Sequence, residues 1–378
     1  MKLLYASERP PFPYFLGGAA RSAHYLLSAA HRKHGAAVMS IGALDFEGRR
    51  WSAADIQDQG ALEVTAIQDD GASVRAHCGY PTQLLGSFYD ALPAFIDGEG
   101  PDVVWTQLDG FERIARISRS QGHDTLVYLR DAEDSPAALR AVAQAGCALV
   151  CNSEFMARRV GSLTGSRAAV IYPSLESRFG VSGDPEGFVT MINPHAVKGV
   201  DTFLALAQAL PGQRFLLVES WKLDSGALNA LHERLARLPN VSFMHRVADV
   251  AEVYARSRLV LVPSRWEEAF GRVVIEAQSC AIPVLVSKRG GLPEAVGDRS
   301  MIVNDYANVD AWLAAMRPLL ASPARYREAA QLALANAEHE RFTTNCAARQ
   351  LLDICSDRSW FGSPRGGIAG WIRRWRAG

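Results

Sequence analysis

Short apolar runs alternate with amphipathic segments along the whole chain. In the first half the runs are "KLLYAS", "AAVMSIGA", "DVVWTQ", "DTLVYLRD" and "CALVCNS", and in the second half "FVTMIN", "RFLLVES", "VSFMH", "RLVLVPS" and "IPVLVSK". Between them, segments such as "ARSAHYLLSAAHRKHG" and "VDTFLALAQALPG" repeat apolar residues with the helical period. Continuous rather than alternating apolar strands indicate parallel strands that are buried on both faces. The pattern therefore predicts an α/β protein with doubly wound parallel sheets.

The strand-and-helix pattern occurs twice, with a break in "VIYPSLESRFGVSGDPEGF", which is rich in Pro, Gly and Ser. A chain of 378 residues is long for one core and sufficient for two. We place a first Rossmann-like domain at residues 1–175 and a second at residues 176–345. They are expected to face each other across a cleft at the carboxyl ends of both sheets, where open α/β sheets bind ligands.

Composition narrows the classes of function. Lysine plus arginine number 40, as do aspartate plus glutamate, so no overall field attracts nucleic acid and no nucleic-acid partner is expected. No GxGxxG follows the first strand, which counts against a dinucleotide-dependent oxidoreductase. The six cysteines form no CxxC pair and are expected to be buried thiols. No apolar stretch approaches the roughly 18 residues that span a bilayer, and the first run is too short for a signal peptide, so we expect a cytoplasmic protein.

Two carboxylates, Glu268 and Glu276, are separated by seven residues in "EEAFGRVVIEAQSCAIPVLVSKRGGLPEAV". The preceding "RLVLVPS" predicts a strand, and Gly271 begins a predicted helix. Backbone amides near Phe270, Gly271 and Arg272 would lie at the positive end of the helix dipole, which favours a phosphate. An ionised carboxylate only accepts hydrogen bonds, so vicinal hydroxyls are natural partners. The stretch predicts a site for a ribose and a sugar joined by a diphosphate, or alternatively a surface helix with a salt-bridged glutamate.

The same stretch resembles the nucleotide-sugar site of the retaining GT-B-fold glycosyltransferases of family 4, also called glycosyl transferases group 1. Their hallmark is Glu, seven residues, Glu, a short strand and a Gly-Gly-x-Pro-Glu turn. Glu268, Glu276 and "GGLPE" at 290–294 match it in order and spacing. "FLGGAARSAHYLL", "CNSEFMARRV", "VIYPSLE" and "PHAVKGVDTFLAL" resemble further segments of these enzymes. The resemblance runs from Met1 to about residue 345 and implies the GT-B fold.

The resemblance implies a role for each matching residue. Glu276 would hold the ribose hydroxyls, and Glu268 would contact the donor sugar at its reacting face. Lys198 would contact the diphosphate beside the helix-start amides, with a solvated lysine at a turn as the alternative. Gly17 and Gly18 would let the backbone of the first domain approach the diphosphate or the acceptor, because no Cβ intrudes. Glu268 and Lys198 are the first catalytic candidates.

The predicted diphosphate site lacks one cation of the family pattern. The Gly-Arg that usually precedes the lysine is replaced by Asn193 and Pro194 in "MINPHAVKG". This removes one of two charges expected to stabilise the leaving group, and it leaves Asn193 as a donor-binding candidate. Arg272, Arg265 or Arg21 is a candidate to compensate, with Arg272 first.

The acceptor side and the base site also depart from the family. Arg130 stands where the family often has a histidine, and Asp131 follows it, so both are catalytic candidates. This pair indicates either an anionic acceptor or a charge cluster of Arg130, Asp131 and Glu133 with only a structural role. His245 occupies the turn where the family usually has a glycine, and it either touches the base or is a structural histidine.

The resemblance implies transfer of a sugar from a nucleoside diphosphate to an acceptor hydroxyl with retention of anomeric configuration. The setting it implies is bacterial-type synthesis of cell-envelope polysaccharide, glycolipid or glycoconjugate, with a carbohydrate or lipid-linked acceptor. Lys198, an arginine and helix amides would neutralise the departing diphosphate, so no metal and no cofactor is expected. A nucleotide-sugar epimerase and a non-catalytic nucleotide-binding scaffold of the same fold remain as alternatives. The sequence names neither the nucleotide, the sugar nor the acceptor.

The C-terminal segment, from about residue 346 to 378, ends in a basic and aromatic tail, "SWFGSPRGGIAGWIRRWRAG". Ile368, Trp371, Ile372 and Trp375 form one apolar stripe at helical spacing with arginines beside it. Such a helix can lie on an anionic membrane, which would make the enzyme peripheral on the inner face. In the alternative the segment packs back on the first domain, since the glycines of the tail weaken a free helix.

Overall fold

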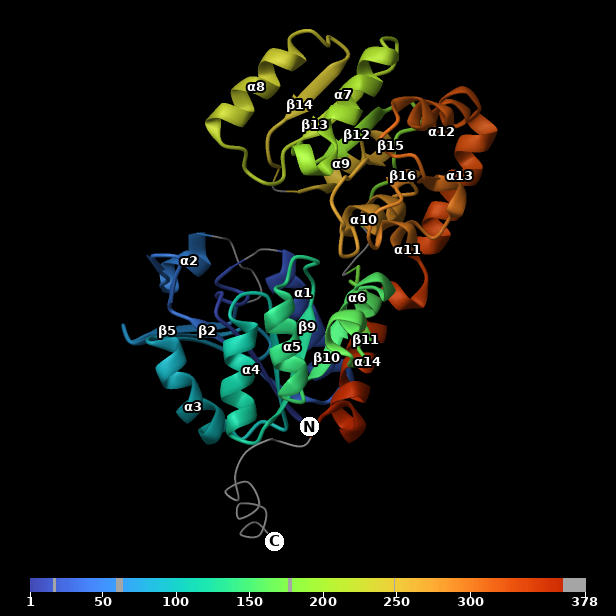
Figure 1. Cartoon of the computed structure of the whole chain (residues 1–378). Helices are drawn as coiled ribbons and strands as arrows, with labels where there is room; N and C mark the ends of the chain where they lie inside the picture. Colours follow the sequence, from blue (N-terminus) through green and yellow to red (C-terminus); the bar gives the residue numbers. More distant parts are fainter. Residues whose placement is uncertain (16–17, 59–63, 176–178, 248, 363–378) are drawn as a thin grey trace. The chain divides into compact units, whose positions relative to one another are not determined.

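The computed structural model describes residues 1–15, 18–58, 64–175, 179–247 and 249–362, which divide into two compact units. Unit 1 comprises Met1–Ser174 and the described chain from Thr343 onward, and unit 2 comprises Leu175–Phe342 (Figure 1). The sequence analysis placed the two divisions after residues 175 and 345. Gly17 and the apolar stripe from Ile368 to Trp375 lie outside the described residues.

Unit 1 is built on a nine-stranded sheet in the order β11-β10-β9-β8-β1-β2-β7-β6-β5. Its strands are β1 Lys2–Ser7, β2 Ala37–Ala43, β5 Ala66–Asp69, β6 Ser73–His77, β7 Pro81–Leu85, β8 Val103–Gln107, β9 Asp124–Leu129, β10 Ala148–Cys151 and β11 Ala169–Val170. From β11 to β7 every neighbouring pair is parallel, which confirms the predicted parallel core of the sheet.

One edge of this sheet differs from the prediction. β6 is antiparallel to both β7 and β5, so the sheet is not parallel throughout. The connections at residues 70–72 and 78–80 are too short for the crossover of a dozen or more residues that parallel strands need, and they can join only antiparallel strands. A further short hairpin pairs β3 Asp45–Phe46 with β4 Arg49–Arg50. The missed strands are short and partly polar, so no continuous apolar run marks them.

Helices cover both faces of the sheet in unit 1. They are α1 Gly18–His34, α3 Phe88–Glu99, α4 Phe111–Ser120, α5 Pro136–Gln144, α6 Glu154–Thr164 and α14 Thr344–Ser356, with the short α2 Ala53–Asp58. Successive side chains of β1 point to opposite faces, so Leu3 and Tyr5 pack with α1 and α14, whereas Leu4 and Ala6 pack with α3 and α4. The described part of the C-terminal segment therefore belongs to the core of unit 1.

Unit 2 is built on a six-stranded sheet in the order β14-β13-β12-β15-β16-β17, and its paired strands are parallel. The strands are β12 Phe188–Ile192, β13 Phe215–Val218, β14 Val241–Met244, β15 Ser257–Val262, β16 Val284–Ser287 and β17 Ile302–Val303. The helices are α7 Val200–Ala209, α8 Ser225–Leu235, α9 Ala251–Tyr254, α10 Arg272–Ser279, α11 Leu292–Val296, α12 Val309–Ala321 and α13 Pro323–Ala337. Trp312, Phe203 and Phe215 are completely buried in its core.

Two smaller expectations have a structural answer. All six cysteines are free and buried, as predicted. Among the described helices, none is both long enough and apolar enough to cross a membrane.

Candidate functional site

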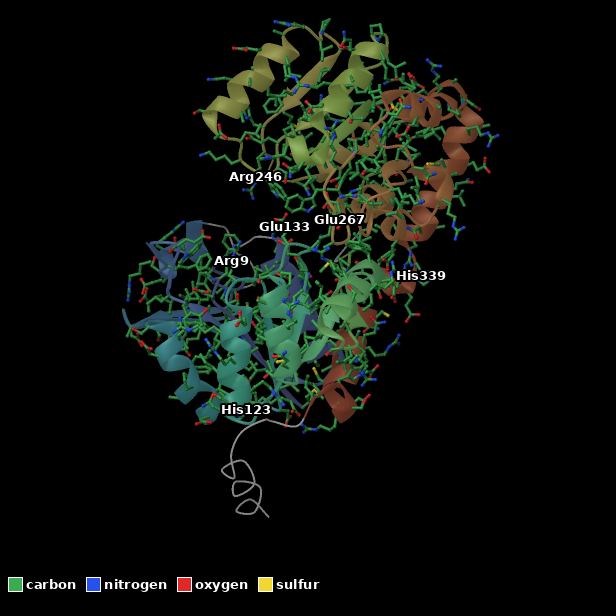
Figure 2. The ribbon with its side chains drawn as sticks, in the orientation of Figure 1. Arg9, His123, Glu133, Arg246, Glu267 and His339 are labelled. Carbon is green, nitrogen blue, oxygen red and sulfur yellow. The ribbon has the colours of Figure 1, made fainter. Side chains whose placement is uncertain are left out.

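The carboxyl ends of the parallel strands of unit 2 place a set of polar and aromatic residues along one edge of the sheet. Lys198 follows β12 in the short helix η1 Ala196–Lys198, Trp221 follows β13, His245 follows β14 and Glu268 follows β15. Figure 2 labels Arg246 and Glu267, the immediate neighbours of two of these residues. Because the carboxyl ends of parallel strands lie at one edge, four loops that are distant in sequence contribute to one site.

An ion pair joins two of the predicted catalytic residues. Lys198 Nζ lies 2.6 Å from Glu268 Oε1, and the two side chains are only 13% and 15% exposed. The lysine is therefore not the solvated turn residue that was the alternative prediction. Gly199 follows it with φ 87°, and a Cβ there would overlap the carbonyl of Pro263. Glycine at this position lets η1 lie against the end of β15, which brings the lysine to Glu268.

The Gly-Gly turn supports the backbone of Glu268. Gly290 has φ 55°, and a Cβ on it would lie 2.7 Å from the Glu268 nitrogen. The amide of Gly291 donates to the Glu268 carbonyl at 2.7 Å, and a Cβ on Gly291 would lie 2.6 Å from the carbonyl oxygen of Ala269. The "GGLPE" turn thus lets two backbone segments touch, and the position of the Glu268 carboxylate depends on that contact.

The Glu276 carboxylate, on α10, accepts hydrogen bonds from two side chains. The hydroxyl of Tyr254 donates to Oε2 at 3.0 Å, and Arg272 Nε donates to Oε1 at 3.1 Å. Burial, together with the nearby Glu276 carboxylate, raises the pKa of Tyr254 well above its usual value, so the phenol stays a donor. Arg272, the first candidate to replace the missing cation, thus forms a salt bridge with Glu276, as the alternative interpretation predicted. That interpretation placed the glutamate on a surface helix, but the Glu276 side chain is only 16% exposed.

The sequence analysis placed phosphate-binding amides at Phe270, Gly271 and Arg272, and α10 starts at this point. Gly271 is its N-cap with φ 95°, and as a glycine it has no side chain to cap the helix. A Cβ on Gly271 would lie 2.5 Å from Leu292 Cδ2, so this residue also lets α10 and α11 pack closely. The Phe270 ring is buried and lies 5.9 Å from that of Phe342, so only the backbone of Phe270 can serve a ligand.

The remaining donor candidates of unit 2 have different surroundings. Asn193 is buried with φ 76°, and its backbone N–H donates to the Val218 carbonyl at 2.7 Å. The residue therefore shapes the turn before Lys198. The His245 side chain is 67% exposed, and its Nδ1 lies 3.1 Å from Glu219 Oε2. Arg265, a further candidate cation, is exposed.

The acceptor-side candidates belong to unit 1. Arg130 follows β9, donates to the Ser22 hydroxyl at 3.1 Å and lies over the ring of Tyr128 at 3.9 Å. Asp131 Oδ1 accepts a hydrogen bond from the Glu133 amide at 3.0 Å. Gly18 begins α1, and a Cβ on it would meet nothing within 4 Å. Arg21, the third candidate cation, is exposed on the same helix.

A charged cavity of about 660 Å³ lies in unit 1 at the ends of β1, β8 and β9. Arg9, Asp109, Arg113, Asp131 and Asp134 are among its lining residues, and Arg9 Nε lies 2.8 Å from Asp109 Oδ2. Figure 2 labels Arg9 and Glu133 near the edge of the sheet at which the cavity lies. Burial, with the charges of Asp131 and Asp109, raises the pKa of Asp134 to about 7. Of these residues the sequence analysis had singled out Asp131 alone.

Three aromatic residues of the site in unit 2 escaped the sequence analysis. Tyr254 contacts Glu276, while the rings of Trp221 and Trp266 lie 4.6 and 5.8 Å from Lys198 Nζ. Tyr254 lies 22 positions before Glu276, and no helical or strand spacing connects them. A tryptophan at or just beyond the end of a predicted strand was a readable signal for Trp221 and Trp266, because the ends of parallel strands line ligand sites.

Comparison with known proteins agrees with this fold and with the family resemblance. Residues 187–322, which lie within unit 2, match the family described as Glycosyl transferases group 1. A D-inositol 3-phosphate glycosyltransferase of Segniliparus rotundus is 38% identical over 176 residues, which are 44% of this chain and 38% of the relative. The enzyme of the same name from Mycolicibacterium smegmatis is 33% identical over 219 residues, 50% of this chain and 48% of the relative. The chain thus matches less than half the length of either relative.

Solved structures share the fold over nearly the whole chain. Anabaena HepE in complex with UDP superposes with a TM-score of 0.73 at 18% identity, covering 94% of this chain and 100% of that one. Sucrose-phosphate synthase of Thermosynechococcus elongatus gives 0.70 at 15% identity and covers both chains completely. The chain has the GT-B fold of two Rossmann-like units, as the resemblance implied.

We expect Gly290→Ala to destabilise unit 2. The left-handed backbone and the contact with the backbone of Glu268 leave no room for a methyl group, which should lower the free energy of unfolding by about 2 kcal/mol or more. Chemical denaturation measures the change. Gly212→Ala, at an exposed glycine with open space around its Cα, is the control and should change it by less than about 0.5 kcal/mol. Equal stability of the two variants would refute the packing role of the turn.

We expect Asp134 to make the stability of unit 1 depend on pH. Its folded-state pKa of about 7 lies above the ordinary value of 3.8, so between these values the folded state binds a proton that the unfolded state lacks. The stabilisation is present at low pH and is lost as pH rises toward 7. Asp134→Asn should therefore raise Tm relative to the native protein by roughly 4 °C more at pH 8 than at pH 5. The exposed Asp353→Asn is the control, and a pH-independent difference for Asp134→Asn would contradict the assignment.

Proposed function

We propose that this protein is a glycosyltransferase that moves a sugar from a nucleoside diphosphate to an acceptor hydroxyl with retention at the anomeric carbon. The observation that carries the proposal is the arrangement at the sheet edge of unit 2. A paired and mostly buried ammonium, two carboxylates and a helix start with a glycine N-cap lie in segments that follow the adjacent strands β12 and β15. Anion-binding and hydroxyl-binding groups are therefore combined in one site, which is the chemistry that a sugar nucleotide requires.

The diphosphate is assigned to Lys198 and the start of α10. A diphosphate would give the ammonium a second anionic partner while Glu268 stays within hydrogen-bonding reach, so the lysine would bridge donor and carboxylate. As the sugar leaves, negative charge builds up on the diphosphate, and this preorganised positive charge stabilises it. In this proposal the protein's own groups supply that charge, and turnover needs no metal ion.

The ribose is assigned to Glu276. Tyr254 and Arg272 each donate one hydrogen bond to a different carboxylate oxygen, so the carboxylate is fixed in place. Each carboxylate oxygen accepts more than one hydrogen bond, which leaves acceptor positions for two vicinal hydroxyls. Fixing the carboxylate before the donor binds lowers the entropy lost on binding.

Retention is assigned to attack on the same face of the sugar from which the diphosphate leaves. The acceptor oxygen forms the new bond to the anomeric carbon, and the bond from that carbon to the phosphate oxygen breaks. The acceptor proton passes to the leaving phosphate oxygen, so the products are the glycosylated acceptor and the nucleoside diphosphate. Glu268, beside Lys198, would contact the donor sugar at its reacting face.

The acceptor is assigned to unit 1, with an anionic or polyhydroxylated compound as the first choice. The charged cavity contains Asp131, directly after Arg130, and offers both donors and acceptors of hydrogen bonds. The relatives named D-inositol 3-phosphate glycosyltransferases make a phosphorylated polyol a reasonable first acceptor to test. A setting in envelope glycoconjugate synthesis is supported by the fold likeness to WaaG, described as involved in lipopolysaccharide biosynthesis, at a TM-score of 0.63 and 15% identity.

We expect one nucleoside diphosphate to stabilise the protein against heat in a screen of UDP, GDP, ADP, CDP and dTDP. UDP is the first candidate, because the structural neighbour HepE holds it. Glu276→Ala should abolish the shift, since the ribose hydroxyls lose their acceptor. Glu328→Ala, at an exposed glutamate of α13, should retain it. If no nucleotide shifts Tm in the native protein, the donor site does not exist as proposed.

We expect Glu268→Gln to lower turnover by about a hundredfold while nucleotide affinity changes little. The amide keeps the size of the side chain but loses the charge beside Lys198, and removing one preorganised electrostatic contact costs about that much. The measurement is the release of nucleoside diphosphate with the stabilising sugar nucleotide and an acceptor panel, in buffer containing EDTA. Loss of activity in EDTA would contradict metal independence, and a sugar isomer formed without acceptor would identify an epimerase. Binding without turnover for every donor would favour the scaffold.

A further inference from the structure

Trp221 is an exposed indole held in a defined position beside the ion pair. Trp221 follows β13 and is 51% exposed. It is one of the few large apolar residues at the surface of the described part of the chain. Lys198 Nζ lies over its ring at 4.6 Å from the centroid, and the ring of His195 meets it edge-on at 5.5 Å. A large aromatic surface left in water but fixed by a cation and a second ring is a feature of ligand sites rather than of a core.

The loop that carries Trp221 is anchored next to the indole. Glu219 is buried, and its carboxylate accepts a hydrogen bond from the backbone amide of Leu223 at 3.0 Å. This hydrogen bond closes the loop. The same carboxylate lies 3.1 Å from His245 Nδ1 on the neighbouring strand end. Leu223 is buried as well, so the residues near the indole are fixed while the indole itself stays accessible.

The strand order decides which part of a sugar nucleotide the indole can meet. β13 lies between β14, which is followed by His245, and β12, which leads to Lys198. Glu268 and Trp266 come from β15, on the other side of β12. If Lys198 holds the diphosphate and Glu276 the ribose, the sugar extends toward the loop after β15. The base then extends toward the segments after β13 and β14, because Tyr254 of α9, which follows β14, contacts Glu276.

From this geometry we propose that Trp221 is the stacking residue for the base of the nucleoside diphosphate, an inference that rests on the proposed donor site. The exposed indole face is planar, and every nucleobase presents a planar π-face to it. Stacking of this kind tolerates all bases. Trp221 therefore strengthens binding of any nucleoside diphosphate, and selection among bases depends on hydrogen bonds from other groups.

The test compares two probes that share the diphosphate and differ in the base. Calorimetry measures Kd for UDP, or for whichever nucleotide stabilises the protein, and for inorganic pyrophosphate. Trp221→Ala should weaken nucleotide binding about tenfold or more and change pyrophosphate binding less than about twofold. Trp221→Phe, which keeps a smaller stacking face, should fall between. Leu332→Ala, which removes an equally exposed apolar side chain elsewhere in unit 2, is the matched control and should bind both probes normally.

Each other outcome overturns a definite part of the inference. Equal weakening of both probes would show that Trp221 acts only through Lys198 and does not stack. Unchanged binding of both probes in Trp221→Ala would show that the indole does not touch the donor. If the native protein binds pyrophosphate but no nucleotide, or binds neither, the proposed donor site itself fails, and that result is separate from the first two because it appears without any substitution.

Discussion

The ammonium of Lys198 and the carboxylate of Glu268, 2.6 Å apart and mostly removed from solvent, are the contact around which the site of unit 2 is arranged. Two partly buried charges are costly unless each faces the other, so the loops that carry them must meet accurately. Glycine makes this possible on both sides. Gly199 lets one loop lie against Pro263, and Gly290 and Gly291 let the other lie against the backbone of Glu268.

The surroundings of this pair divide into a part held ready and a part open to ligand. Glu276 is fixed by Tyr254 and Arg272, whereas Trp221 keeps half its surface exposed above the lysine. Arg272 cannot be counted simply as a replacement for the missing diphosphate cation, because it already neutralises Glu276. In the proposed donor site Lys198 and the start of α10 supply positive charge to the diphosphate, and an aromatic contact to the base would add affinity without adding charge.

Unit 1 differs from unit 2 in its sheet and in its charged cavity. Its sheet continues beyond the parallel core into an antiparallel edge, and its cavity gathers arginines and aspartates from the ends of three strands. Burial and the charges of two nearby aspartates raise the pKa of Asp134 to about 7. The cavity thus combines both charge signs with a carboxyl of raised pKa, and the stability of unit 1 should respond to pH.

The sequence by itself determined the ten parallel strands that its apolar runs mark, because continuous apolar runs are buried on both faces of such a sheet. It did not mark the parallel strands β7, β11 and β17. It also determined the Glu-x7-Glu spacing and the Gly-Gly turn, since these are local and depend on neighbouring residues. Only the tertiary structure decided that Tyr254 holds Glu276, that Lys198 lies over the Trp221 ring and that the pKa of Asp134 is raised. Each of these contacts joins distant segments through the order of strands in a sheet, which no local pattern of residues records.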